Sequence, residues 1–582
     1  MNKHEVAHIL DEIGTLLSLK GENPFKIRAY QNAARAVENL SEDLQVVVDE
    51  ERLEEIPGIG KKIALKITAL VNTGKLPYFE KLKKSIPPGL LDLLNVPGLG
   101  GKKIKALYQK LRIKTKKDLI EACKKGRIAR LKGFGQKTQD NILSNIAKIE
   151  TYGKRVYWWD AEKNAQSILE EIASHKDVSE AEIAGSFRRN LETVGDLDIL
   201  VSSSHPEKVM EWFVKRPWVE KVLAKGPTKS SVLLKTGLQV DLRVIPKKQF
   251  AAALIYFTGS KEHNIRIRTK ANILGVTLSE YGLEPLTGAR LKKAAQRLTP
   301  KVLSTEEAIY KFLGMKFIPP ELREDMGEVE AALKKKIPEL VEYKDIKGAF
   351  HCHTTDSDGH NTLQEMVEAA QKLKWQYIGI SDHSKSSFQA NGMDEKRLFD
   401  QTKRIKKLNG SKKFSTYVFA GLECDILLNG KLDFPDRVLK ELDFVIVSVH
   451  RSFNLDEKTM TARIIKAIEN PYTTMLGHLT GRLLLKRDAY AVNIPKVIDA
   501  CIANKVIIEL NASPMRLDMD WRFWHKASDK GLKCSINPDA HSVAELEYVR
   551  AGVNVARKGW LEKKDIFNTL TLAKVLAYLK KR

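Results

Sequence analysis

The sequence predicts a multidomain protein of the α/β and α+β classes, with helical domains first, an α+β region next and a (β/α) barrel last. Its 582 residues exceed what one hydrophobic core usually organises. Glycine turns between helical stretches repeat in the first 150 residues, and apolar strand-like runs alternate with helical stretches after about residue 346. A hydrophobic content of 43% and a charged content of 29% are typical of a folded globular chain.

The charge balance is strongly basic, with a formal net charge of +25. Such an excess favours a polyanionic partner, and a solvated basic surface without a partner is the alternative. The five cysteines are scattered without CxxC spacing, which argues against a disulfide framework and against a cysteine zinc finger. The sequence has neither a secretory N-terminus nor a long apolar run. We therefore expect a cytoplasmic or nucleoid-associated protein with no membrane partner. We expect a monomer because nothing in the sequence demands an oligomer.

Three segments repeat a glycine turn before a lysine-bearing helical stretch. They read IPGIGKKIALKI from Ile56, VPGLGGKKIKALYQK from Val96 and LKGFGQKTQDNI from Leu131. The glycines would expose backbone N–H groups at a helix start, where a phosphate can bind, although a simple helix cap explains any single copy. The pattern resembles the helix-hairpin-helix motif, which implies a grip on the DNA backbone without base reading. The DNA-binding residues implied are Gly58, Gly60, Gly98, Gly100, Gly133 and Gly135.

A strand, a turn, a short helix and a second strand follow from Ala181, in the stretch AEIAGSFRRNLETVGDLDILVSSS. Asp196 and Asp198 lie two residues apart at the start of the second strand, so both side chains point to one face. Asp241 lies on another β-branched run, VDLRVI, that can pair alongside. Three converging carboxylates can hold two Mg²⁺ ions, whereas two exposed turn acids are the alternative explanation of the first pair.

The stretches GSFRR, GDLDIL, VDLRVIP and LIYFTGSKEHNIRIR, in this order, resemble family X DNA polymerases over about residues 1 to 317. The resemblance implies a nucleotidyltransferase palm with a thumb, and Mg²⁺ or Mn²⁺ held by the catalytic residues Asp196, Asp198 and Asp241. It implies gapped or primed DNA and dNTPs as substrates. The nucleotide-binding residues implied are Gly185, Ser186, Arg189, Gly195, Tyr256, Phe257, Gly259, Asn264 and Arg268.

The N-terminal stretch NPFKIRAYQNAARAV, followed by the first glycine turn, resembles the deoxyribose-phosphate lyase domain of the same family. This implies that Lys66 forms a Schiff base with an abasic sugar. Nearby cations would favour the neutral amine by lowering the pKa of Lys66, and an ordinary surface lysine is the alternative. The residues implied to bind the 5′-phosphate of DNA are Lys26, Tyr30 and Lys62.

Beyond about residue 346, polar residues follow the apolar runs YIGI, YVFAGLE, FVIVSV, YTTML, VIIEL and LKCSIN. Their spacing predicts a (β/α) barrel, whose catalytic rim lies where the strands end. A lone strand-end histidine is usually structural, but many such groups on one rim would be costly to bury unless metals neutralised them. The candidate metal ligands are His351, His353, Asp358, His383, Glu423, His450, His478, Asp539 and His541.

The motifs HCHTTDSDG, SDHS, GLECDI, SVH, GH and DAH, in this order, resemble the polymerase and histidinol phosphatase (PHP) domain over about residues 346 to 582. The resemblance implies a distorted (β/α)7 barrel with about three ions, Mn²⁺ or Zn²⁺, that hydrolyses phosphoric esters. Glu423 would bridge metals, and Asp382 would orient His383 or approach a metal. Ala349 stands where we would expect an acid that supports the ligands.

The pairing of the two sites resembles the bacterial and archaeal form of family X polymerase. It implies a repair polymerase that fills short gaps, with 3′–5′ exonuclease and, as further activities, AP endonuclease and 5′-deoxyribose-phosphate lyase. A small-molecule phosphatase in the barrel and a non-enzymatic DNA-end scaffold are the alternatives. The expected domains are a helical lyase-like domain with a helix-hairpin-helix (1–80), helix-hairpin-helix fingers (81–150), a palm (151–250), a thumb (251–318), a linker (319–345) and the PHP domain (346–582).

Overall fold

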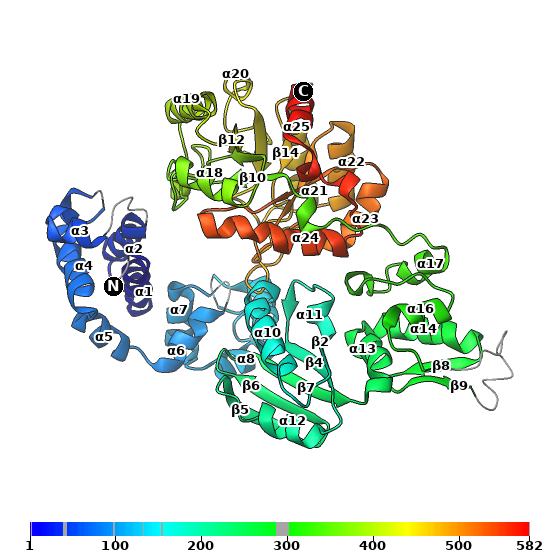
Figure 1. Cartoon of the computed structure of the whole chain (residues 1–582). Helices are drawn as coiled ribbons and strands as arrows, with labels where there is room; N and C mark the ends of the chain where they lie inside the picture. The colour runs from blue at the N-terminus through cyan, green and yellow to red at the C-terminus, as the bar shows by residue number, and fades with distance from the viewer. Residues whose placement is uncertain are drawn as a thin grey trace. The chain divides into compact units, whose positions relative to one another are not determined.

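The computed structural model in Figure 1 describes residues 1, 3–38, 44–56, 58–96, 99–131, 133–152, 155–286 and 302–580. The chain divides into two compact units, residues 1–153 and residues 154–582, and each unit has hydrophobic cores of its own. Among the described helices, none combines the length and the apolar character that a membrane crossing requires.

The first unit is helical throughout its described residues. Leu10, Ile13 and Leu17 lie one helical turn apart, so they form one face of the first helix and are fully buried. The α-helices are α1 (Lys3–Lys20), α2 (Pro24–Glu38), α3 (Leu44–Asp49), α4 (Lys61–Thr73), α5 (Pro77–Lys84), α6 (Pro88–Asp92), α7 (Gly101–Leu111), α8 (Lys116–Lys124) and α9 (Gly135–Tyr152). Short 3-10 turns η1 (Arg52–Glu55) and η2 (Leu93–Asn95) precede two of the glycine turns.

The three glycine segments form the same turn. In each, the N–H of the fourth motif residue donates to the carbonyl of the first at 3.0 Å, in the pairs Ile59 to Ile56, Leu99 to Val96 and Phe134 to Leu131. Helices α4, α7 and α9 begin directly after these turns. Gly58 and Gly133 have φ values of 97° and 91°, where glycine is favoured, and Gly60 and Gly100 are the residues before α4 and α7. Gly98 lies outside the described residues.

The second unit begins with a five-stranded sheet in the order β2-β4-β7-β6-β5. Its central strands β4 and β7 are parallel, whereas the other neighbours are antiparallel. The strands are β2 (Glu180–Ile183), β4 (Asp196–Ser202), β5 (Val219–Lys225), β6 (Lys229–Leu234) and β7 (Gln239–Ile245), and β1 (Val156–Tyr157) pairs with β3 (Thr193–Val194) beside them. The helices are α10 (Trp158–Ala173), α11 (Gly185–Arg188) and α12 (Pro206–Phe213).

A smaller helical region follows the sheet. It contains η3 (Lys247–Gln249), α13 (Phe250–Thr258), α14 (Lys261–Ile273), the hairpin of β8 (Val276–Ser279) and β9 (Gly282–Pro285), and α16 (Glu306–Phe312). The segment 319–345, expected to be a linker, carries η4 (Pro320–Leu322), α17 (Glu328–Leu333) and η5 (Tyr343–Asp345). Leu322, Val329 and Ala332 of this segment are buried in one core with Ile309 of α16, so the segment packs against this region.

Seven parallel strands form the C-terminal barrel in sequence order. They are β10 (Gly348–Cys352), β11 (Tyr377–Ile380), β12 (Tyr417–Asp425), β13 (Phe444–Ser448), β14 (Met475–Leu476), β15 (Ile507–Asn511) and β16 (Cys534–Asn537). A parallel bridge from Cys352 to Ala540 brings the first strand next to the chain that follows the last one, so the sheet nearly closes. The structure thus confirms the predicted seven-stranded barrel and every strand expected in it.

Helices surround the barrel strands in Figure 1. They are α18 (Leu363–Lys372), α19 (Glu395–Ser411), α20 (Asp436–Leu439), α21 (Glu457–Ile468), α22 (Ile494–Ala503), α23 (Trp521–Asp529), α24 (Val549–Lys558) and α25 (Leu572–Leu579). Strands such as FVIVS of β13 are buried throughout, and apolar up to their final residue, because both of their faces are covered. Phe350, Phe419 and Phe444 form an aromatic cluster in the core. The polar residues lie instead at the carboxyl ends of the strands.

Candidate active sites

The first site lies at the starts of the parallel strands β4 and β7. Asp198 is the direct register partner of Asp241, and Asp196 precedes Asp198 by two residues on the same strand. Gly185 begins α11 beside them with a φ of 64°, and a Cβ atom at that position would lie 2.4 Å from Asp198 Oδ2. Only glycine fits this approach, which brings the backbone of the predicted phosphate-binding turn against the acids.

The electrostatics of Asp196 and Asp198 favour a bound cation. Burial raises the pKa of Asp198 to about 6, and repulsion from Asp196 and Asp241 adds to this effect. The pKa of Asp196 is also raised, first by burial and then by Asp241. Positive charge placed among these carboxylates would remove their mutual repulsion.

Asp241 differs from its partner, because Lys229 Nζ lies 2.8 Å from its Oδ2 atom and Gln239 Nε2 donates to its Oδ1 atom at 2.9 Å. These hydrogen bonds, led by that from Lys229, hold the pKa of Asp241 below its ordinary value although burial alone would raise it. In the described part of the chain, the sets of ligand atoms that lie within 4.8 Å of one another all belong to the barrel. The three aspartates are therefore spaced more widely, and Lys229 was not foreseen from the sequence.

The remaining nucleotide-site candidates lie around the turn after α11 and at the end of α13. Arg189 Nε donates to Glu324 Oε1 at 2.9 Å, and its Nη1 donates to the carbonyl of Thr258. A Cβ atom on Gly259, whose φ is 73°, would lie 3.1 Å from Arg189 Nη1. The structure therefore brings Arg189 to the Tyr256–Gly259 segment, and Arg189 is 12% exposed.

The other nucleotide-site candidates lie on α11, α13 and α14 and directly before β4. The rings of Tyr256 and Phe257 meet edge to face at 5.1 Å, and Asn264 Nδ2 donates to the carbonyl of Tyr256 at 2.7 Å. The Oδ1 atom of Asn264 is buried without a hydrogen-bond partner. Arg268 is exposed on α14. Ser186 lies in α11, and Gly195 immediately precedes β4, as expected for the turn before the acids.

In the first unit, Lys66 lies among the residues predicted to accompany it. Lys66 Nζ donates to the carbonyl of Lys62 at 2.8 Å and lies 5.2 Å from the ring centre of Tyr78 and 5.9 Å from that of Tyr30. Burial, followed by the charges of Lys26 and Lys62, lowers the pKa of Lys66. A lowered pKa favours the neutral amine that nucleophilic catalysis needs.

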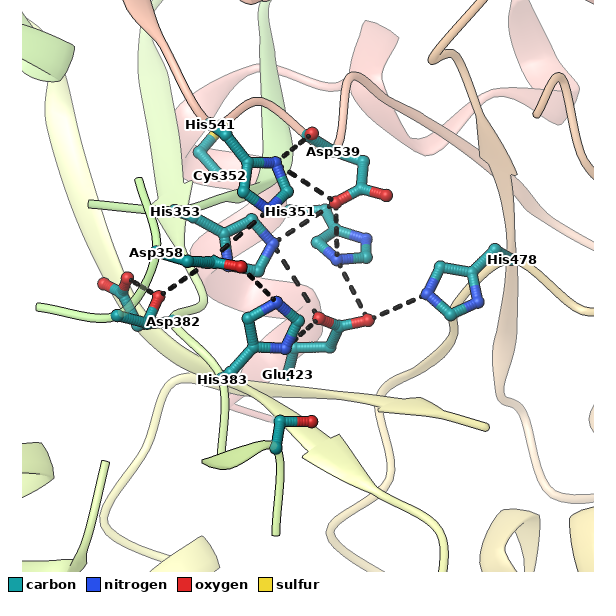
Figure 2. Close-up of polar contacts among 12 residues, drawn as sticks. His351, Cys352, His353, Asp358, Asp382, His383, Glu423, His478, Asp539 and His541 are labelled. Carbon is teal, nitrogen blue, oxygen red and sulfur yellow. Dashed lines mark hydrogen bonds and ion pairs between the residues drawn. The ribbon is translucent and has the colours of Figure 1, made fainter. Parts of the chain in front are cut away.

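The second site gathers all nine predicted ligands at the carboxyl end of the barrel. Figure 2 shows Glu423 among the surrounding histidines. Its Oε1 atom lies 3.2 Å from His351 Nε2, and its Oε2 atom lies 2.8 Å from His383 Nδ1. Oε1 also lies 3.1 Å from His450 Nε2 and 3.0 Å from His478 Nε2. Glu423 is 1% exposed, so it occupies the buried centre of the cluster.

Two aspartates, Asp539 and Asp358, complete the cluster around His353. Asp539 Oδ1 lies 3.3 Å from His353 Nε2 and 3.4 Å from His351 Nε2. Asp358 lies 3.6 Å from His383 Nε2 and 3.5 Å from His541 Nε2. Three overlapping sets of ligand atoms result, which are His353 with Asp358, His383 and His541; His351 with His353 and Asp539; and His383 with Glu423 and His450.

The cluster contains buried polar atoms that the protein itself leaves without a hydrogen bond. They are His351 Nε2, both ring nitrogens of His353, His383 Nδ1, Glu423 Oε2 and His478 Nδ1. Burial lowers the pKa of His353 to about 3, with the charges of His541 and His383 adding to the effect, so this imidazole is neutral as a metal ligand must be. Unpaired buried nitrogens and oxygens are costly, and divalent cations would satisfy them. The residues therefore fit a metal cluster.

Two acids that support this cluster were missed by the sequence reasoning. Glu509 Oε2 lies 2.6 Å from His351 Nδ1, and Asp425 Oδ1 lies 3.0 Å from His450 Nδ1. Such partners fix a histidine ring and its tautomer. Glu509 thus supports His351 although Ala349 carries no acid. The signal was present in the sequence, since Glu509 interrupts the otherwise apolar strand VIIEL.

The hydrogen bonds of Asp382 go to the loop after β10 and to Gln401, and not to His383. Asp382 accepts hydrogen bonds from the backbone N–H and the hydroxyl of Thr354, both at 2.7 Å, and from Gln401 Nε2 at 2.6 Å. Figure 2 draws Asp382 at the edge of the cluster, beside Asp358. Its hydrogen bonds hold the loop after β10, which carries His353 and Asp358, and in this way they position two ligands.

Comparison with known families assigns each region of the chain. Family models match as a helix-hairpin-helix domain (1–76), a SAM-like helix-hairpin-helix tandem (90–148), a DNA polymerase beta palm (158–266), a DNA polymerase beta thumb (253–324) and a PHP domain (349–513). The aspartates of the first site lie in the palm, and seven of the nine barrel ligands lie in the matched PHP segment. Fold and sites define a polymerase beta-like palm and thumb joined to a PHP barrel.

Relatives extend this assignment to the whole chain. A protein of Bacillus subtilis (strain 168) named DNA polymerase/3′-5′ exonuclease PolX is 37% identical over 584 residues, which cover 100% of both chains. The chain therefore belongs to the family X DNA polymerases with a C-terminal PHP domain. DNA polymerase lambda of Rattus norvegicus is 24% identical over 341 residues, covering 54% of this chain and 56% of that protein. A probable phosphatase of Thermoanaerobacter sp. (strain X514) is 28% identical over 245 residues, covering 40% of this chain and 94% of that protein.

Proposed function

We propose that this protein is a DNA-directed DNA polymerase that fills short repair gaps, and that its barrel is a 3′–5′ exonuclease. The observation that carries the proposal is that one chain holds two sets of ligands with different donor atoms. Asp196, Asp198 and Asp241 offer oxygen alone, whereas the barrel cluster is rich in imidazole. Oxygen donors suit Mg²⁺ or Mn²⁺ and nucleotide addition, and mixed nitrogen and oxygen donors suit Mn²⁺ or Zn²⁺ and hydrolysis.

At the palm, the three aspartates would hold two divalent cations, and such ions would supply a more acidic primer 3′-hydroxyl and positive charge for the leaving phosphates. Asp241 is ionised because Lys229 lowers its pKa, and we assign it the role of assisting removal of the 3′-hydroxyl proton. Gly185, Ser186 and Arg189 bind the triphosphate, and Gly195 permits the turn before the acids. Tyr256, Phe257 and Gly259 face the sugar, and Asn264 and Arg268 face the minor groove of the new base pair.

In the first unit, the three glycine turns bind the DNA backbone, since each exposes a helix start to solvent. Lys26, Tyr30 and Lys62 bind a 5′-phosphate at the far side of the gap. Lys66 provides the amine for lyase chemistry, and its lowered pKa supports that role. Incubation of a 5′-deoxyribose-phosphate end with borohydride tests this point, because a Schiff base is trapped covalently on the parent and is absent from Lys66→Ala.

In the barrel, the nine clustered residues would hold about three ions, Mn²⁺ or Zn²⁺, and such ions would supply polarisation of the phosphodiester and a more acidic attacking water. Glu423, at the centre of the cluster, would be a ligand shared by these ions. Glu509 and Asp425 orient His351 and His450, and Asp382 holds the loop of His353 and Asp358. The same arrangement would serve incision at abasic sites, because the scissile phosphodiester is chemically the same.

A small-molecule phosphatase is the second candidate for the barrel, because the probable phosphatase of Thermoanaerobacter is similar over 245 residues, 94% of its own length. Two assays separate the candidates. Release of nucleotides from a labelled 3′ end supports the exonuclease, and preferred release of phosphate from histidinol phosphate supports the phosphatase. We favour DNA because the chain also carries three glycine turns and a formal net charge of +25.

We also propose the domain boundaries predicted from the sequence, a monomeric state and a cytoplasmic location.

The decisive experiment uses a 5′-phosphorylated one-nucleotide gap with Mg²⁺ or Mn²⁺, with and without dNTPs. Asp198→Ala should abolish extension and keep degradation of the 3′ end, whereas Glu423→Ala should do the reverse. Extension that survives in Asp198→Ala would refute the palm assignment, and degradation that survives in a folded Glu423→Ala protein would refute the barrel assignment.

A further inference from the structure

A lysine of the barrel is buried against the nucleotide turn of the palm. Lys558, the last residue of α24, is 0% exposed. Its Nζ atom donates to the carbonyl of Arg189 at 3.1 Å, to the carbonyl of Glu321 at 3.3 Å and to Glu324 Oε1 at 2.5 Å. An ammonium group has three N–H donors, so these contacts satisfy all of them.

The same lysine also controls the side chain of Arg189. Glu324 Oε1, which accepts from Lys558, accepts from Arg189 Nε at 2.9 Å. Lys558 therefore holds Arg189 at two points, directly at its backbone carbonyl and through Glu324 at its guanidinium. The third fixed point is the carbonyl of Thr258, which accepts from Arg189 Nη1 next to Gly259.

We propose that Lys558 is a positioning residue of the polymerase site, through which the barrel orients Arg189 toward the triphosphate of the incoming nucleotide. The inference rests on the proposed role of Arg189 as a phosphate ligand. A planar guanidinium binds phosphate well only when its N–H groups face the phosphate oxygens. Contacts at Nε and at the backbone fix this orientation before the nucleotide arrives, which lowers the entropy lost on binding.

Docking of the barrel on the palm does not by itself require this lysine. Arg550 of the same helix pairs with Glu162 of α10 at 2.7 Å, and Arg557 pairs with Glu321 at 2.8 Å. A buried ion pair rarely stabilises an interface more than apolar side chains of similar volume would. The feature that an apolar residue could not reproduce is the simultaneous contact with the Arg189 carbonyl and with Glu324. This geometry favours an orienting role over a purely adhesive one.

The test measures KM and kcat for the correct dNTP on a one-nucleotide gap, and 3′-end degradation without dNTPs, in the full-length protein. In Lys558→Met, which keeps a chain of similar length, we expect KM for dNTP to rise about tenfold, as for the partial loss of one charge-assisted contact. We expect kcat to change less than KM, and degradation to match that of the parent. Glu324→Gln should raise KM by a smaller factor, and the double variant should show less than the product of both effects, because the two residues share one contact.

Arg550→Met is the matched control, since it removes another cation of α24 whose ion pair is with Glu162 and not with Glu324, and its KM for dNTP should equal that of the parent. Arg189→Ala separates the two proposals. If Arg189→Ala leaves KM unchanged, the role of Arg189 as a phosphate ligand is wrong. If Arg189→Ala raises KM but Lys558→Met and Glu324→Gln do not, the positioning role is wrong. Equal loss of extension and degradation in Lys558→Met would also overturn it, because the lysine would then only hold the two regions together. Should Lys558→Met not fold, Glu324→Gln decides.

Discussion

Asp198 and Asp241 lie opposite each other on neighbouring parallel strands, yet their surroundings shift their pKa values in opposite directions. Burial and two acidic neighbours raise the pKa of Asp198 to about 6. Lys229, 2.8 Å from Asp241, keeps the pKa of that residue below its ordinary value. In the metal-free protein, the charge on Asp198 therefore opposes folding, whereas the charge on Asp241 favours it.

Asp198→Asn should stabilise the metal-free protein near neutral pH. The folded pKa of Asp198 lies above its unfolded value, so its cost is absent below the unfolded pKa, grows as the pH rises and is complete above about pH 6. A shift of roughly two units corresponds to at most about 3 kcal/mol. Thermal unfolding in EDTA should show a higher Tm for the variant at neutral pH and equal values below about pH 4.

Asp241→Asn is the control, because it should destabilise the metal-free protein near neutral pH whereas Asp198→Asn should stabilise it. The folded pKa of Asp241 lies below the unfolded value, so its stabilising contribution is present above the unfolded pKa and is lost as the pH falls through the folded pKa. The variant should lower Tm in EDTA at neutral pH, and this deficit should shrink in acid. If both variants moved Tm in the same direction at neutral pH, the electrostatic account of the site would be wrong.

The elements, and the positions of both sets of candidate ligands within them, could be predicted because their signals are local. Asp196 and Asp198 share a face through the two-residue period of a strand, and the barrel histidines lie at or just after the ends of short apolar runs typical of buried strands. In a parallel barrel the carboxyl ends of all strands lie at one rim. Residues that follow the strands are therefore close together in space, even when they are far apart in the sequence. The glycine turns are equally local, since each closes within four residues.

Most of the residues that were missed act across long stretches of chain. Glu509 reaches His351 across 158 positions, whereas Lys229 is nearer and reaches Asp241 from β6, the antiparallel strand that precedes β7. Lys558 lies 369 positions from Arg189. No period connects such pairs, because their distance depends on how whole elements pack. Asp382 shows the same limit in another way. Its place beside His383 in the sequence suggested His383 as its partner, whereas in the fold it accepts a hydrogen bond from Thr354.

Glu509→Gln should weaken metal binding in the barrel by about 10- to 100-fold, because His351 would lose the carboxylate that fixes its ring. Degradation of a 3′ end should then require more Mn²⁺ for half-maximal rate and should recover at saturating metal. Primer extension should be unchanged. Glu365→Gln is the control, since this exposed acid only caps α18, and its metal requirement should match the parent. Loss of degradation that no metal concentration restores would contradict a role in positioning alone.

Metal should stabilise the barrel by mass action. Binding to the folded state alone contributes about 2.7 kcal/mol at a hundredfold excess over Kd. In Asp198→Ala, which disables the palm site, titration of Mn²⁺ into the EDTA-treated and desalted protein should still raise Tm with concentration. The additional change Glu423→Ala should remove most of this rise, because Glu423 lies within 4 Å of five histidines of the cluster. A rise of the same size in both proteins would place the stabilising metal elsewhere.

Gly133→Ala should weaken binding to gapped DNA. Gly133 has a φ of 91°, and a Cβ atom there meets no other atom within 4 Å, so the substitution distorts the backbone of the third glycine turn without a steric clash. Loss of one amide contact to a phosphate should lower affinity by about three- to tenfold. It should also make the salt dependence shallower by at most about one unit of slope. Gly126→Ala is the matched control, because Gly126 also has a positive φ of 66° and open space but lies in the turn after α8, outside the glycine motifs. Fluorescence anisotropy over a salt series distinguishes them: if both variants lost affinity equally, backbone strain and not the phosphate contact would be the cause.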